Sequence, residues 1–272
     1  MKRQDGASVT GPAAQPPGWH GKLPSLGDFA SRRLDASFIE PWDSWLAAGL
    51  LALREAQPEG WLDGYLGSPS WRFLLMPGAM PGAAGAQAWA GVLMPSVDRV
   101  GRYFPLTLVQ PLHGGPGSTQ EMAGLWQWLA RLDELARDAL FEDWTADRLE
   151  EELARMALPA LSPLAGPRAG AGAVVGAGAG AGAGAGVGVS LREGAGTVAA
   201  AAPGAVVELS APGVGDAALH IGMQAQRAWA DAAQGQAWWH ARPDENPPRL
   251  LVSRGLPAAI SLARLFGPAA TM

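Results

Sequence analysis

Two short polar clusters hold the residues of this chain that are best placed to do chemistry. The first cluster spans 21–29, and the second spans 95–106. In each, Gly and Pro favour a loop, and an Asp stands four residues before an Arg, which for the first cluster is Arg32, just after its end. A carboxylate–guanidinium pair could therefore lock each loop. The candidate side chains of the two clusters are Lys22, Asp28, Arg32, Ser96, Asp98, Arg99 and Arg102.

Three interpretations of these clusters are open. The charged pairs could simply pin the two loops, or the loops could form a recognition surface, since positioned loops often carry binding residues. A third interpretation is a small-molecule hydrolase that uses Asp28 or Asp98. A deep pocket with an imidazole and a raised carboxyl pKa would favour the hydrolase. Ion pairs with Arg32, Arg72 or Arg102 would count against it.

The familiar catalytic and cofactor motifs do not occur. The chain has no cysteine, which excludes thiol catalysis and disulfides. The pair Gly21-Lys22 lacks the Ser or Thr and the first glycine of a phosphate-binding loop, and the Gly/Ala tract never forms Gly-x-Gly-x-x-Gly. No Gly-x-Ser-x-Gly motif is present, and the four histidines are scattered without metal-ligand spacing. We therefore expect no cofactor and no metal.

Periodicity predicts the helices that position the clusters. Ser37 and Glu40 have the spacing of a capping box before a helix that ends by Pro58, and Ser118 and Glu121 have it before a helix that reaches Leu140. Two shorter helices are predicted, over 145–156 and over 257–266.

Short apolar runs predict the strands, at 71–76, 89–94, 104–109, 205–209, 237–240 and 250–253. Strand hairpins followed by helices favour an α/β fold of the α+β type, in which a central mixed, largely antiparallel sheet carries helices on both faces. Such a fold has three layers.

Composition divides the chain into ordered and low-complexity parts. All 12 Trp lie outside 145–228. We predict a disordered tail over 1–16, a main block over 17–158, a flexible Gly/Ala/Pro-rich insertion over 159–203, and a segment over 204–267 that completes the same domain. A net charge of −5 gives no electrostatic reason to expect nucleic acid. The Gly/Ala-rich run is too weakly apolar to predict a membrane span.

Five separated motifs lie in order at 18–24, 27–29, 41–43, 68–73 and 91–106. Together they resemble the TagF/ImpM family of type VI secretion-associated proteins. Departures occur at His20 and Leu26, where the family has an aromatic and commonly a basic residue. The resemblance covers about 17–158, and the Trp238-Trp239 pair and Gly255-Leu256-Pro257 also resemble the family's ending.

The resemblance implies a cytoplasmic accessory protein that restrains the assembly or firing of a type VI secretion system after translation. It implies binding to a forkhead-associated scaffold protein, and a compact α/β domain. Some relatives are fused to a PP2C-type phosphatase domain, but its Asp cluster is missing here, so we expect no enzyme activity. Reversing a charge by Arg102→Glu or Asp98→Arg should then weaken scaffold binding with the melting temperature near wild type. The expected binding or loop-pinning residues are Lys22, Asp28, Arg32, Arg72, Ser96, Asp98, Arg99 and Arg102.

Overall fold

A computed structural model describes residues 15–116, 118–163, 206–210, 233–241 and 249–266. Most of the predicted tail and of the predicted insertion lies outside these described residues. The elements in chain order are β1 (Gly18–Gly21), β2 (Ala30–Arg32), α1 (Ala36–Ala56), α2 (Trp61–Leu66), β3 (Trp71–Leu75), the 3₁₀ helix η1 (Gly82–Ala86), β4 (Ala88–Met94), β5 (Leu106–Leu112), β6 (Gly114–Gly115), α3 (Thr119–Phe141), α4 (Ala146–Leu153), β7 (Ser162–Pro163), β8 (Val206–Ser210), β9 (Gln236–Ala241), β10 (Arg249–Arg254) and the 3₁₀ helix η3 (Ala259–Arg264).

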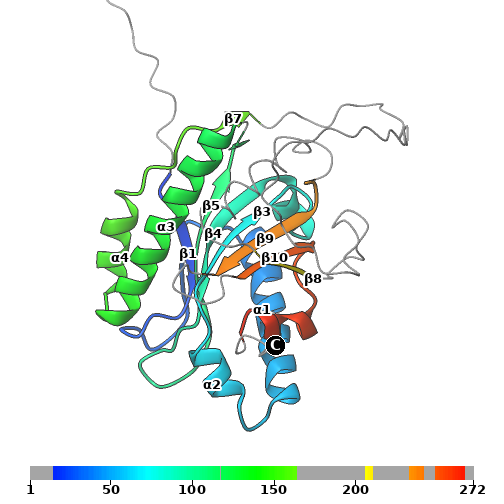
Figure 1. Ribbon diagram of the computed structural model, residues 1–272. Coiled ribbons are helices and arrows are strands. Elements are labelled where there is room, and N and C mark those ends of the chain that lie inside the picture. Colours follow the sequence, from blue (N-terminus) through cyan, green and yellow to red (C-terminus); the bar gives the residue numbers. More distant parts are fainter. Residues whose placement is uncertain (1–14, 117, 164–205, 211–232, 242–248, 267–272) are drawn as a thin grey trace, which may run out of the picture.

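One sheet of eight strands forms the middle layer, in the order β2-β1-β5-β4-β3-β9-β10-β8. Every pairing within it is antiparallel. Helices α3 and α4 cover one face, and α1 lies on the other with η3 (Figure 1). The predicted α/β class, with a largely antiparallel sheet between helices, is confirmed.

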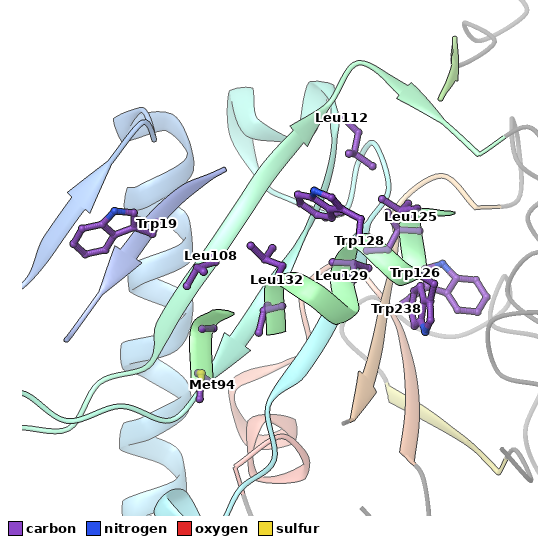
Figure 2. Close-up of a cluster of buried hydrophobic side chains, with 14 of the residues drawn as sticks. Trp19, Met94, Leu108, Leu112, Leu125, Trp126, Trp128, Leu129, Leu132 and Trp238 are labelled. Atoms are coloured by element: carbon purple, nitrogen blue, oxygen red, sulfur yellow. The ribbon is translucent and has the colours of Figure 1, made fainter. Parts of the chain in front are cut away.

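The central strands bury both faces, because their side chains alternate between two hydrophobic clusters. In β4, Val92 faces the cluster under α3 and α4, whereas Trp89 and Leu93 face the cluster under α1. Figure 2 shows the first cluster, where Trp128 and Leu132 of α3 lie over the sheet. A strand buried on both faces gives a continuous apolar run, which is why the sequence predicted these strands well.

Two helix starts test the capping predictions. Helix α3 begins as predicted, since the Ser118 hydroxyl accepts a hydrogen bond from the Glu121 amide at 3.1 Å. The prediction of a capping box at Ser37 is wrong. Helix α1 begins one residue after Asp35, whose extended backbone carbonyl accepts the first helical hydrogen bonds, so Ser37 already lies inside the first turn.

The strands at 18–21 and 30–32 were not predicted, and neither was helix α2. Strand β1 has Gly at both ends, which favours a loop by sequence, yet it pairs with β5 on one side and β2 on the other. Its tertiary pairing overrides its composition. The predicted helix over 257–266 is the 3₁₀ helix η3, over a shorter range.

Strand β9, from late in the chain, lies in the interior of the sheet between β3 and β10. The Trp71 indole donates to the Leu265 carbonyl at 2.9 Å, and the Trp45 indole donates to the Pro257 carbonyl at 2.7 Å. These contacts join the late segment to β3 and α1. The division of the chain into four parts stays a prediction, because so much of 159–232 lies outside the described residues.

Across the described ranges, no helix combines the length and the apolar character needed to cross a bilayer.

Candidate functional site

The two predicted loops lie side by side because of the sheet order. Strand β1 pairs antiparallel with β5, so the chain leaving β1 lies next to the chain that enters β5. The Ser96 hydroxyl donates to the Lys22 carbonyl at 2.7 Å, and the Arg99 amide donates to the Leu26 carbonyl at 3.0 Å. The structure therefore brings together Lys22, Asp28, Ser96, Asp98, Arg99 and Arg102.

Asp98 is the centre of this site, with a side chain that is fully buried. One oxygen, Oδ1, accepts from the amides of Val100 at 3.0 Å and Arg102 at 2.9 Å. The other, Oδ2, accepts from Lys22 Nζ at 2.5 Å and from Arg102 Nε at 2.7 Å. Burial alone would raise the pKa of Asp98, but these donors stabilise its charged form and hold the pKa well below its usual range.

Lys22 is the buried partner of Asp98, with only 3% of its side chain exposed. Its ammonium also lies over the Phe29 ring, at 4.4 Å from the centroid. The Phe29 ring contacts Phe104 edge-on at 4.8 Å and stacks near His20 at 6.2 Å. An aromatic layer therefore shields the buried Lys22–Asp98 pair on one side.

Asp28 is not arranged as the sequence predicted. Its carboxylate is 80% exposed and lies 3.6 Å from Arg102 Nη2. The predicted partner, Arg32, lies on the edge strand β2 and donates to the carbonyl of its neighbour Ser31 at 2.9 Å. The prediction of an Asp28–Arg32 pair is therefore wrong, because the backbone turns into β2 between the two residues and Arg102 reaches across from the other loop.

Arg72 lies away from the two loops, on the strand β3. Its guanidinium is buried and pairs with Asp133 of α3, with Nε at 3.0 Å and Nη2 at 2.9 Å from Oδ2. The Ser70 hydroxyl donates to the other Asp133 oxygen at 2.5 Å. Arg72 thus connects the sheet to α3 and is not exposed to a partner.

Tyr65 is a site residue that the sequence did not reveal. Its hydroxyl accepts from the Ser96 amide and donates to the Ser96 carbonyl, both at 2.9 Å. Burial raises the pKa of Tyr65 above its usual value, although the hydrogen bond with Ser96 opposes the shift. The residue comes from α2, a helix of six residues too short to show a periodic pattern.

Asp98 and Asp28 do not have the surroundings that the hydrolase interpretation requires. Asp98 already accepts four hydrogen bonds and its pKa is lowered, so it is neither a general acid nor a free base at neutral pH. Asp28 is open to solvent. Within the described part of the chain, no three potential metal ligands cluster together.

The exposed residues of the two loops form a surface that the buried Lys22–Asp98 pair holds in place. We define the loop edge as Asp28, Phe29, Arg99, Val100 and Arg102, all of which are exposed. Val100 is 65% and Phe29 47% exposed, so apolar surface lies between the charges. This mixture of apolar and charged groups suits binding to another protein. The buried Asp98 makes one expectation wrong: Asp98→Arg would place an unpaired cation beside Lys22 and could not leave stability unchanged.

The buried side chain of His240 leads to a prediction of how the stability of the fold depends on pH. Burial, together with a smaller contribution from the charge of Arg72, lowers the pKa of His240 to about 4. The unfolded chain, with an ordinary value of 6.5, then binds a proton that the folded chain rejects, so stability falls as the pH falls from about 6.5 to 4. We expect His240 to contribute a loss of roughly 3 kcal/mol across that range.

Melting temperatures of the wild type and His240→Leu, measured from pH 7 to pH 4.5, check this expectation. The wild type should lose stability more steeply than the variant on acidification. The lowered pKa of Asp98 does not interfere, since its contribution is lost only when the pH falls below about 3.8. Parallel curves for the two proteins would contradict the expectation.

Comparisons with known proteins find a family match for this chain and a solved structure similar to it. Residues 18–156 match the family described as the TagF N-terminal domain, type VI secretion system-associated. The chain is also similar to PA0076 from Pseudomonas aeruginosa PAO1, for which a crystal structure is known. The two chains are 29% identical, with a TM-score of 0.63, over 94% of this chain and 96% of that one. A comparison with curated proteins finds no match.

Proposed function

Because this chain belongs to the TagF family of type VI secretion-associated proteins, we propose that it restrains the assembly or firing of a type VI secretion system after translation, by binding another protein. The family match over residues 18–156 is the observation that carries this proposal. In this proposal the protein acts in the cytoplasm, without catalysis or a cofactor. Its partner is a forkhead-associated scaffold protein of the same secretion system.

The loop edge is the surface that we assign to this partner. Asp98 and Lys22 are used internally, where they hold the two loops together. Asp28, Arg99 and Arg102 remain outside with their charges accessible to a polar partner surface. Charged groups at a rim steer association and fix its register, whereas the apolar Val100 and Phe29 supply contact area.

Substituting Val100 tests this assignment. We expect Val100→Glu to weaken scaffold binding by about tenfold or more, because it places a carboxylate in the apolar part of the loop edge. The melting temperature should stay near wild type, since the Val100 side chain is exposed and only its backbone amide contacts Asp98. Calorimetric titration of the scaffold with each purified protein measures the affinity.

Ile260→Glu is the matched control. Ile260 is 80% exposed on η3, which packs with α1 and lies apart from the loop edge, so the same chemical change should leave binding unaltered. Arg99→Glu should act like Val100→Glu. In a strain that lacks the gene, the wild type should restore restraint of secretion, and the Val100 variant should not. Equal loss in the Ile260 control, or no loss at Val100, would remove the loop edge as the binding surface.

A further inference from the structure

A groove of about 630 Å³ lies beside the loop edge, and none of the five residues of the loop edge lines it. One wall is the end of α3, another is the turn between α2 and β3, and the third is the chain that leaves β4. Its lining is mainly apolar with a few hydroxyl groups, and among the described residues that form it are the large apolar Leu66 and Phe141 and the cation Arg137. It adjoins the loop edge through the segment that runs from Val97 to Asp98.

Two large apolar side chains of the groove are open to solvent. Phe141 is 79% exposed at the end of α3, and Leu66 is 50% exposed at the end of α2. The Arg137 guanidinium stacks on the Phe141 ring, at 5.5 Å from the centroid. Exposed apolar surface that borders a groove is typical of a site that another molecule covers.

Three carboxylates lie near Phe141 outside the groove lining, whereas the groove lining itself carries the cation Arg137. Glu134 and Asp138 precede Phe141 by seven and three residues on α3, so all three share one exposed face. Asp143 follows the helix and is also exposed. Within the described ranges, none of these three carboxylates has an ion-pair partner. Asp138 and Asp143 stand at the carbonyl end of α3, where negative charge opposes the helix dipole and lowers helix stability.

The charge pattern identifies the kind of occupant. A second copy of this chain has a net charge of −5, so two copies would repel one another at an acidic face. The chain's own residues 1–14 are slightly basic, but Met1 and Val9 are their only large apolar side chains. A separate protein segment that carries both cationic and large apolar side chains complements the groove better than either.

We propose that this groove binds a basic, amphipathic segment of a partner protein. The segment places an apolar side chain against Phe141 and Leu66, and its cations lie beside Glu134, Asp138 and Asp143. This interaction is separate from scaffold binding at the loop edge, because it depends on other residues.

A synthetic peptide tests the groove without any assumption about the scaffold. The probe is a fluorescent amphipathic peptide of leucine and lysine, and the control peptide replaces every lysine by glutamate. Fluorescence anisotropy with the full-length chain should show binding of the lysine peptide alone, weakened by added salt. Phe141→Ser should weaken binding by about tenfold, because it removes the main apolar contact and leaves the fold intact.

Two matched variants separate the groove from general attraction to an acidic protein. Asp138→Asn and Glu151→Gln remove the same charge, but Glu151 lies on α4, which contributes no residue to the lining. Only Asp138→Asn should weaken binding and reduce its salt dependence. Equal effects of the two variants, binding of the glutamate peptide, or no response to Phe141→Ser would overturn the proposal.

The other possible occupants are outcomes of the same study. A variant that lacks residues 1–14 and binds the lysine peptide more tightly would show that the chain's own segment fills the groove. A dimer in sedimentation that Phe141→Ser abolishes would assign the groove to a second copy. Either result would overturn the assignment to a separate partner.

Discussion

Replacing Asp133 by alanine is expected to lower the free energy of unfolding by about 3–5 kcal/mol. The Asp133 carboxylate is fully buried and accepts from the Arg72 guanidinium and the Ser70 hydroxyl. In the Asp133→Ala variant, the Arg72 cation would stay buried on β3, and the Asp133 carboxylate would no longer offset the cost of desolvating it. Chemical denaturation followed by tryptophan fluorescence measures the loss.

Two further variants serve as controls for the Asp133→Ala measurement. Asp138→Ala removes an exposed carboxylate from the same helix and should change stability by less than about 0.5 kcal/mol. The double variant Arg72→Met with Asp133→Leu should recover much of the lost stability, because apolar residues of similar volume can replace a buried ion pair. If Asp133→Ala cost no more than Asp138→Ala, the pair would not stabilise the contact between α3 and the sheet.

The second large effect is expected at Asp98. Asp98→Ala should lower the melting temperature strongly, because it leaves the Lys22 ammonium buried and removes the acceptor of two loop amides. Hydrogen exchange should show that the amides of Val100 and Arg102 lose their protection. Scaffold binding should then fall as well, since the loop edge would no longer be held in one conformation.

Two single variants distinguish residues that hold the loop in one conformation from residues that face the partner protein. Asp28→Ala removes an exposed carboxylate of the same edge and should leave the melting temperature and amide protection unchanged. Arg102→Ala should have a small effect on stability, because its side chain is 52% exposed and Lys22 still neutralises Asp98. If Asp98→Ala kept both amides protected, the carboxylate would not organise this loop.

The fold could largely be predicted because its strands and helices carry strong local patterns. Strands β3, β4 and β9 are rich in apolar residues, and α3 combines a capping serine with a long apolar stripe. Strand β1 and helix α2 are short and contain glycine, so only their tertiary contacts reveal them. The placement of Asp133 among the apolar residues of α3 was a visible signal of a buried charge.

Half of the candidate site could likewise be predicted from the sequence. The spacing of Asp98 and Arg102 predicted their pair, because a tight loop brings residues four apart together. The same spacing at Asp28 and Arg32 gave no pair, since a strand begins between them. Lys22 and Tyr65 reach the second loop from 76 and 31 residues away. Contacts of that range depend on strand order, which a single sequence does not specify.

The interior position of β9 has a consequence for how this protein is made. Strand β3 leaves the ribosome with β4 as its neighbour, and its other edge stays open until β9 is synthesised roughly 160 residues later. At typical rates of translation this interval lasts on the order of 10–30 s. During that time Trp71 and Phe73 would be accessible to chaperones, and to neighbouring nascent chains on the same messenger. Biosynthesis, more than the stability of the finished fold, is therefore the stage at which this protein is most exposed to aggregation.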